Sequence, residues 1–107
     1  MTLEGVDLLF VPAEWPDVRL MHWQTLHRAR AIENQMFVCA CNGCGTAGQT
    51  RYGGGSLIID PWGEILASAG GEETVIRAEC DFSVVENIRN SINVFSDRRP
   101  ELYRCGR

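Results

Sequence analysis

Three cysteines that lie close together in the sequence are the side chains best suited to do chemistry. Cys39 and Cys41 lie within an apolar run, and Cys44 follows in a glycine-rich stretch. A structural zinc site needs four ligands, commonly a C-x2–4-C pair on a turn and a second pair elsewhere. Here the first pair is separated by one residue, and a fourth ligand would have to come from Cys80 or a histidine. The spacing favours small buried side chains, and we predict no metal site.

A nucleophilic role for these thiols also lacks support in the sequence. A catalytic cysteine needs a lowered pKa and a neighbouring base, whereas apolar surroundings such as those of Cys39 and Cys41 raise a thiol pKa. Cys44 is expected to be better exposed but has no evident partner. His22 and His27 are five residues apart, which is not the spacing of two ligands on one helix face. We therefore assign no catalytic residue within this chain.

The basic residues exclude several kinds of site. All ten are arginine, so the chain supplies no Walker lysine, no Schiff-base lysine and no lysine general base. The run Gly53-Gly54-Gly55-Ser56 is rich in glycine, but it precedes an expected strand rather than a helix. It is more typical of a tight packing site than of a phosphate loop. Nothing in the sequence calls for a cofactor.

Length and charge limit the class of protein. The chain has 107 residues and a net charge of -4, which fits one domain or less and argues against nucleic acid as a partner. No run of about 18 apolar residues is present, so no membrane span is expected. The first seven residues do not resemble a secretory signal, and the five cysteines then read as reduced thiols. These features predict a cytoplasmic protein.

The first half of the sequence predicts a βαβ unit. Residues 6–12 and 36–42 are nearly continuous apolar runs, typical of strands buried on both faces. Residues 19–35 between them have apolar side chains on several sides, which indicates a helix contacted on more than one face. Two parallel strands joined by a right-handed crossover follow. Residues 43–55 are expected to form a loop.

The second half predicts short antiparallel elements. Strands are expected at 56–60 and 64–68, around a type I turn formed by Asp60-Pro61-Trp62-Gly63. Residues 74–81 alternate between apolar and charged side chains, which predicts an edge strand with one wet face. A helix is expected at 83–91, and residues 93–107 are expected to form an extended tail.

This set of elements leaves the predicted sheet incomplete. A mostly apolar sheet needs cover on both faces, and two helices can cover only one. The opposite face has nothing to lie against within these residues. We therefore expect it to be covered either by a second copy or by a further part of the same protein.

Several stretches resemble one protein family when they are taken together. In this order and spacing, they are similar to the carbon–nitrogen hydrolase, or nitrilase, superfamily, and above all to its bacterial omega-amidase-like amidases. The resemblance covers residues 3–103. The stretches are FVPAEWP (10–16), RARAIENQMFV (28–38), IDPWGEILA (59–67), VF (94–95) and DRRPELY (97–103).

The resemblance implies an α/β fold. Members of this family form a four-layer αββα sandwich and usually pair through their helices. Residues 1–107 would be the C-terminal portion of a single domain and would carry half of the sandwich. That half would be a βαβ unit followed by a hairpin, an edge strand and a C-terminal helix. The implied partners are the missing N-terminal half of the domain and a second copy in a homo-oligomer.

The resemblance also implies an activity that this chain cannot perform alone. The family hydrolyses amides or nitriles with a Glu, a Lys and a nucleophilic Cys, and all three would lie upstream of Met1. No cysteine present matches the motif of the nucleophile, and Gly55 stands where relatives often have a histidine. The complete form is expected to cleave a small carboxamide, whereas this chain alone is expected to be inactive. The alternative is a non-catalytic assembly or partner-binding module.

The expected βαβ unit locates a candidate pocket. Ligands of open α/β sheets bind outside the carboxyl ends of the strands, so residues 12–16 and 42–55 should converge on the site. We predict that Glu14 and Trp15 form part of the substrate-pocket wall and that Ala13 leaves room for the substrate. The alternative is that Trp15 only packs at the end of the sheet and that Glu14 pairs locally.

Overall fold

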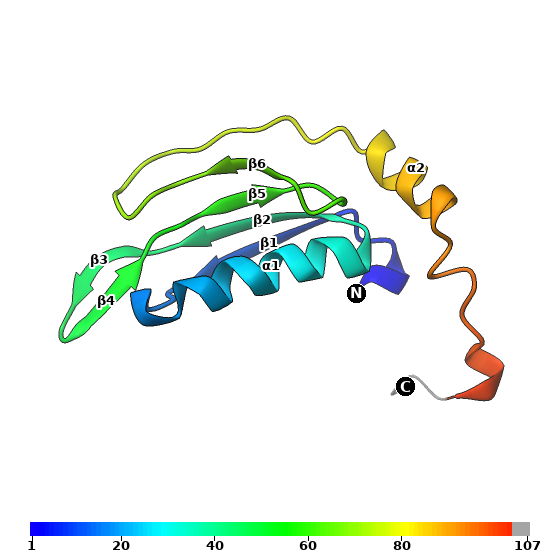
Figure 1. Ribbon diagram of the computed structural model, residues 1–107, viewed down its shortest axis with the longest axis horizontal. Helices are drawn as coiled ribbons and strands as arrows, with labels where there is room; N and C mark the ends of the chain where they lie inside the picture. The colour runs from blue at the N-terminus through cyan, green and yellow to red at the C-terminus, as the bar shows by residue number, and fades with distance from the viewer. Residues whose placement is uncertain (104–107) are drawn as a thin grey trace.

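A four-stranded sheet forms the centre of the computed structural model, which describes residues 1–103. Its strand order is β1-β2-β5-β6 (Figure 1). Strands β1 and β2 are parallel and joined by helix α1 (Leu20–Asn34), whereas β5 and β6 add antiparallel neighbours. The predicted βαβ unit and the following hairpin are confirmed. The strands are β1 (Leu8–Ala13), β2 (Phe37–Asn42), β5 (Leu57–Ile59) and β6 (Ile65–Ser68).

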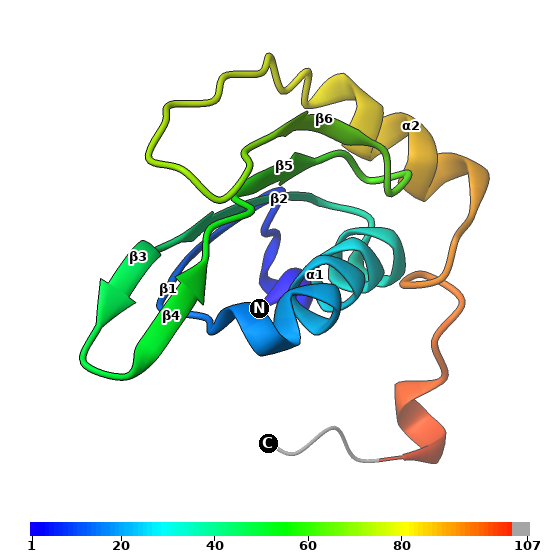
Figure 2. The ribbon, with the colours of Figure 1, turned by 60° about the vertical axis from the view of Figure 1, so that its left-hand side comes forward.

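Helix α1 covers one face of this sheet (Figure 2). Alternate residues of each strand point toward α1 because successive strand side chains face opposite sides. Their apolar side chains form one core with the buried residues of the helix. The buried members of this core are Trp23, Ala31, Met36, Val38, Ala40, Leu57 and Ile59.

The turn between β5 and β6 is built as predicted. The Gly63 N–H donates to the Asp60 carbonyl at 2.9 Å, and the Asp60 carboxylate accepts from the N–H groups of Trp62 and Glu64. Gly63 has φ +86°, and a Cβ there would lie 2.6 Å from Cδ1 of Ile32. Glycine is required at this position for both reasons.

Residues 43–55, expected to be a loop, contain a second hairpin. Strands β3 (Cys44–Ala47) and β4 (Thr50–Gly53) pair antiparallel and project from one end of the main sheet (Figure 1). They are short, and they are built mainly of small or polar residues. They therefore lack the apolar alternation by which strands are recognised in a sequence.

The edge strand expected at residues 74–81 is absent. The segment is extended but joins no strand, and it crosses the face of the sheet opposite α1. At its end, the ring of Phe82 meets that of Phe37 edge-on, with 5.8 Å between ring centroids. Farther back, burial raises the pKa of the Cys80 thiol, and neighbouring Cys39 raises it further. The alternation in the sequence thus reflects packing on the sheet rather than pairing within it.

Helix α2 (Ser83–Ser91) has the residue range predicted from the sequence. It lies at the end of the sheet near the start of β1 (Figure 1). Arg89 anchors it by donating to the Asp7 carboxylate at 3.0 Å and to the Val6 carbonyl at 2.9 Å. The chain then runs away from the sheet and includes a short 3-10 helix, Pro100–Leu102, so the predicted tail is not wholly extended. Residues 104–107 lie outside the described part.

Two further 3-10 helices precede the main elements, η1 (Thr2–Glu4) before β1 and η2 (Asp17–Arg19) before α1. Within residues 1–103, no helix is long and apolar enough to cross a bilayer.

The face of the sheet opposite α1 is largely uncovered. Phe10 is 68% exposed, and Pro12 and Cys41 on the same face are also exposed. Only the crossing segment near Cys80 and Phe82 covers the neighbouring β2 residues. The expectation of one open sheet face is therefore confirmed for the described residues.

This open face predicts that the isolated chain self-associates. Phe10→Ser should weaken that association about tenfold, because burying a phenylalanine side chain contributes ~1.5–3 kcal/mol. The matched control is Val18→Ser on η2, which removes an equally accessible apolar side chain (86% exposed) away from this face. Concentration-dependent light scattering measures the effect. A monodisperse monomer of the unmodified chain would contradict the prediction.

Candidate active-site edge

The carboxyl ends of β1 and β2 meet at one edge of the sheet. The two strands are parallel, and Ala13 is the register partner of Asn42. Beyond the strands, the Gly43 N–H donates to the Ala13 carbonyl at 3.0 Å, and the Gly53 N–H donates to the Trp15 carbonyl at 3.1 Å. The two segments predicted to converge, residues 12–16 and 42–55, are thus hydrogen-bonded to each other. We call this region the active-site edge.

The side-chain amide of Asn42 holds the active-site edge together. Its Oδ1 accepts from the Trp15 N–H at 2.6 Å, while its Nδ2 donates to the carbonyls of Trp15 (3.1 Å) and Gly54 (2.8 Å). Its backbone N–H donates to Oγ of Ser56 at 3.0 Å. Only 8% of Asn42 is exposed. One buried amide therefore cross-links the ends of both strands and the glycine-rich loop.

Sequence reasoning missed this role of Asn42. The available signal was its place in the period-2 pattern of β2, where it follows Val38 and Ala40 on the face toward α1. A polar residue at such a buried position must be hydrogen-bonded.

The three predicted pocket residues lie in three different surroundings. The indole N–H of Trp15 donates to the Arg19 carbonyl, its ring lies 5.9 Å from that of Trp23, and the Arg19 guanidinium lies over it. Ala13 packs against the core on the same side. Glu14 is exposed one residue beyond β1, and the strand alternation directs it toward the open face. Their contact with a substrate stays a prediction.

A cavity of about 220 Å³ opens at the active-site edge. Its walls come from the end of β2, from the loop Gly54–Ser56 and from the segment after β6. Ala13, Glu14 and Trp15 flank this cavity but do not line it. The carboxylates of Glu72 and Glu73, which the sequence did not single out, do line it.

Two of the described thiols, Cys39 and Cys80, lie in surroundings that disfavour the thiolate. Burial raises the pKa of Cys39, and neighbouring Cys41 raises it further. The four described cysteines are free, and residues 1–103 contain no group of three or more potential ligands placed to hold a metal ion. The edge therefore offers the walls of a site, and the thiols with a shifted pKa, Cys39 and Cys80, are not suited to attack.

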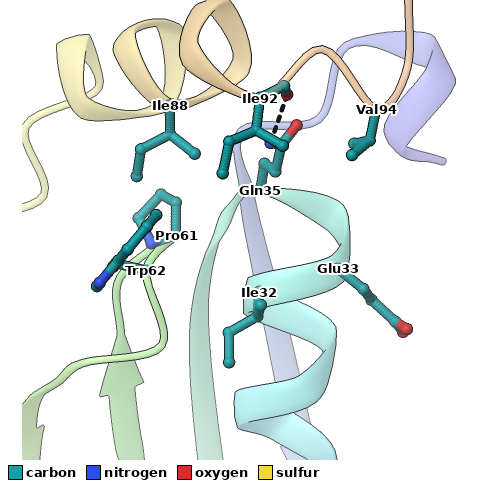
Figure 3. A pocket seen from close by; sticks show the side chains of 8 residues that line it. All are labelled: Ile32, Glu33, Gln35, Pro61, Trp62, Ile88, Ile92 and Val94. Atoms are coloured by element: carbon teal, nitrogen blue, oxygen red, sulfur yellow. Dashed lines mark hydrogen bonds between the residues drawn. The ribbon is translucent and has the colours of Figure 1, made fainter. Parts of the chain in front are cut away.

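A second hollow lies far from this edge, where the C-terminal end of α1 faces α2 (Figure 3). It encloses about 250 Å³ and is lined mainly by apolar side chains, including Ile32 and Ile88 and the 62% exposed Trp62. Within it, the Gln35 amide donates to the Ile92 carbonyl at 2.9 Å. It contains no catalytic constellation.

Asn42→Ala should lower the free energy of unfolding by about 3 kcal/mol. The substitution leaves the Trp15 N–H and the Gly54 carbonyl without partners, and each buried unsatisfied group costs ~1–3 kcal/mol. Asn87→Ala on the exposed side of α2 is the control and should change stability by less than ~0.5 kcal/mol. Urea unfolding measures both. Equal shifts in the two variants would show that the amide does not hold the edge.

Comparison with known proteins identifies the family. The family described as carbon-nitrogen hydrolase matches residues 1–90. The chain is 52% identical over 102 residues to a 2-oxoglutaramate amidase of Bacillus subtilis (strain 168), covering 95% of this chain and 39% of that protein. It is 47% identical over 103 residues to a 2-oxoglutaramate amidase of Paenarthrobacter nicotinovorans, covering 96% of this chain and 35% of that protein.

The fold agrees with these matches. The crystal structure of the Caenorhabditis elegans NitFhit protein superposes with a TM-score of 0.83 at 38% identity, covering 95% of this chain and 25% of that one. The chain thus spans about two fifths or less of the length of these relatives. Its four-stranded sheet, with a helix layer on one face and the other face open, corresponds to half of the nitrilase sandwich. The chain belongs to the carbon–nitrogen hydrolase family.

Proposed function

We propose that this chain is the C-terminal part of an amidase that hydrolyses small carboxamides in the manner of the omega-amidases. The observation that carries the proposal is the 52% identity to a 2-oxoglutaramate amidase over 95% of the chain. The reacting Glu, Lys and Cys would come from a segment that precedes these residues in the complete domain. This chain would contribute one half of the sandwich and part of the pocket.

The chemistry of the chain supports this division. Covalent amide hydrolysis needs a nucleophile, a base and a donor for the oxyanion in one pocket. No lysine is present anywhere in the sequence. Burial raises the pKa of the two described thiols for which a shift is seen, Cys39 and Cys80. The open sheet face around Phe10 offers an apolar surface on which the remaining half of the domain can pack.

The pocket wall would be formed at the active-site edge. The exposed carboxylate of Glu14 is an acceptor suited to the N–H groups of a carboxamide. Trp15 would support it, since its position is fixed by Asn42 and by the tilted contact of its ring with Trp23. The small side chain of Ala13 leaves space beside them.

The alternative is a non-catalytic assembly or partner-binding module that uses the same half-sandwich. The exposed Phe10 favours it as much as it favours a missing half-domain. In either case we expect a homo-oligomer, because α1 exposes apolar side chains such as Met21 and Ile32 on its outer side. Free thiols are consistent with a cytoplasmic location.

The chain alone should release no ammonia from a small omega-amide. Joined to the preceding portion of the Bacillus subtilis relative, it should gain that activity, because the nucleophile, base and oxyanion donor would then share one pocket with its walls. A coupled ammonia assay measures both. Turnover by the 107-residue chain that is abolished by Cys44→Ser would overturn the proposal that the reacting groups lie outside these residues. An inactive but tightly associated pair would favour the assembly module.

In the complete protein, Glu14→Gln and Trp15→Ala should each lower kcat/KM for a small amide about tenfold, a loss of ~1.4 kcal/mol of transition-state stabilisation. The controls are Arg77→Ala and Glu79→Ala, exposed residues of the segment that crosses the open face. Urea midpoints measured alongside separate a loss of pocket contacts from a loss of folding. If all four variants behave alike, the pocket lies elsewhere.

A further inference from the structure

Two aromatic side chains of α1 connect the interior to the glycine-rich loop. Trp23 is 1% exposed, and its indole N–H donates to the Gly55 carbonyl at 2.8 Å. One turn later, Nδ1 of His27 lies 2.8 Å from the Trp23 carbonyl oxygen, and the two rings are 4.2 Å apart. A continuous path of contacts therefore runs from His27 through Trp23 to Gly55.

The loop at the end of this path has little freedom. Gly55 has φ +71°, and a Cβ there would lie 3.1 Å from Cδ1 of Leu20. The N–H groups of Gly54 and Gly55 donate to the carbonyls of Gly43 and Gly70 at 2.9 and 3.0 Å. Gly54, Gly55 and Ser56 line the cavity at the active-site edge. Releasing the Gly55 carbonyl would therefore change the wall of that cavity directly.

The surroundings of Nε2 favour the neutral form of His27. Nδ1 faces a carbonyl oxygen, so this nitrogen carries the proton and Nε2 is left with a lone pair. Nε2 is buried and has no hydrogen-bond partner among the described residues. A second proton would place a charged N–H donor where no acceptor is available, which is costly in a buried site.

The groups around His27 do not offset that cost. Burial lowers the pKa of His27, the hydrogen bond to the Trp23 carbonyl opposes this, and the Arg30 guanidinium lowers the pKa further. The side chains that β1, β2, β5 and β6 direct toward α1 do not titrate, since they are apolar apart from the Asn42 amide and the Ser68 hydroxyl. Asp17 on η2 is paired with Arg51, and the Asp60 carboxylate is engaged by its own turn.

We propose that Trp23 and His27 are positioning residues that make the Gly54–Ser56 wall of the cavity sensitive to pH. Neutral His27 packs against the Trp23 ring and keeps the indole on the Gly55 carbonyl. Protonation adds an N–H at Nε2, which has no acceptor among the described residues, so the ring turns away to reach water and the support of the indole is lost. The catalytic consequence rests on the proposed amidase function, whereas the motion of the loop does not.

The direction of the effect follows from the lowered pKa of His27. In the unfolded chain the imidazole has its ordinary pKa of about 6.5, and in the folded chain the value is lower. Above about pH 6.5 the side chain is neutral in both states, and the loop is fully anchored. The anchoring is lost as the pH falls through the folded-state pKa.

Hydrogen exchange followed by mass spectrometry tests the loop in the complete protein. Labelling at pH 7.5 and pH 5.0, with times corrected for intrinsic exchange, should show protection of residues 53–56 falling at least about fivefold at the lower pH, the loss expected for one hydrogen bond. His27→Phe keeps a ring against Trp23 and cannot titrate, so its protection should not depend on pH. His27→Gln serves if that variant does not fold.

Two further variants complete the test. Trp23→Phe removes the indole N–H, together with part of the buried ring, and should lower protection of the loop at both pH values. His22→Gln changes the other histidine of α1, which is exposed, and should behave as the unmodified protein does. Unchanged protection in Trp23→Phe, or an equal loss at pH 5.0 with and without His27, would overturn the proposal.

The pH profile of activity separates this proposal from the proposed function. If the complete protein is an amidase, kcat/KM should fall at low pH less steeply in His27→Phe than in the unmodified protein and in His22→Gln. Identical profiles would overturn the catalytic part. If the complete protein has no amidase activity, the proposed function is wrong. The hydrogen-exchange result then decides by itself whether His27 controls the loop.

Discussion

The buried amide of Asn42 is the interaction on which the active-site edge depends. Two parallel strands bring their carboxyl ends together, but they leave the backbone groups that follow without ladder partners. Asn42 supplies these partners, because one side chain both accepts from Trp15 and donates to Trp15 and Gly54. With 8% exposure, it does so largely out of contact with water, where an unmade hydrogen bond is most costly.

The two faces of the sheet next to this edge are covered to different extents. On one side, the core between the sheet and α1 buries Trp23, whose indole reaches the same glycine-rich loop from the helix. On the other side, the sheet has only an extended segment across it, fixed by the contact of Phe82 with Phe37. One face thus gives the fold its stability, and the other is left as an apolar surface on which a further layer can pack.

This asymmetry explains why the chain looks like part of an enzyme. Two of its polar side chains at the edge, those of Asn42 and Ser56, hold loops in place. Its thiols Cys39 and Cys80 lie in surroundings that raise their pKa, which suits packing and not attack. Such a half-domain can form part of a pocket wall, and under the proposed function the reacting groups come from the rest of the domain.

The sequence by itself determined the βαβ unit, the turn at Asp60 and the open sheet face, because apolar periodicity and turn chemistry are local properties of the chain. Its motifs also identified the family. Only the tertiary structure decided that residues 74–81 cross the sheet without pairing in it, since alternation is the same for both arrangements. The hairpin of β3 and β4 and the role of Asn42 likewise depended on partners distant in sequence. Hydrogen bonds between such partners produce no regular spacing of residue types in the sequence, so they can be identified only in the folded structure.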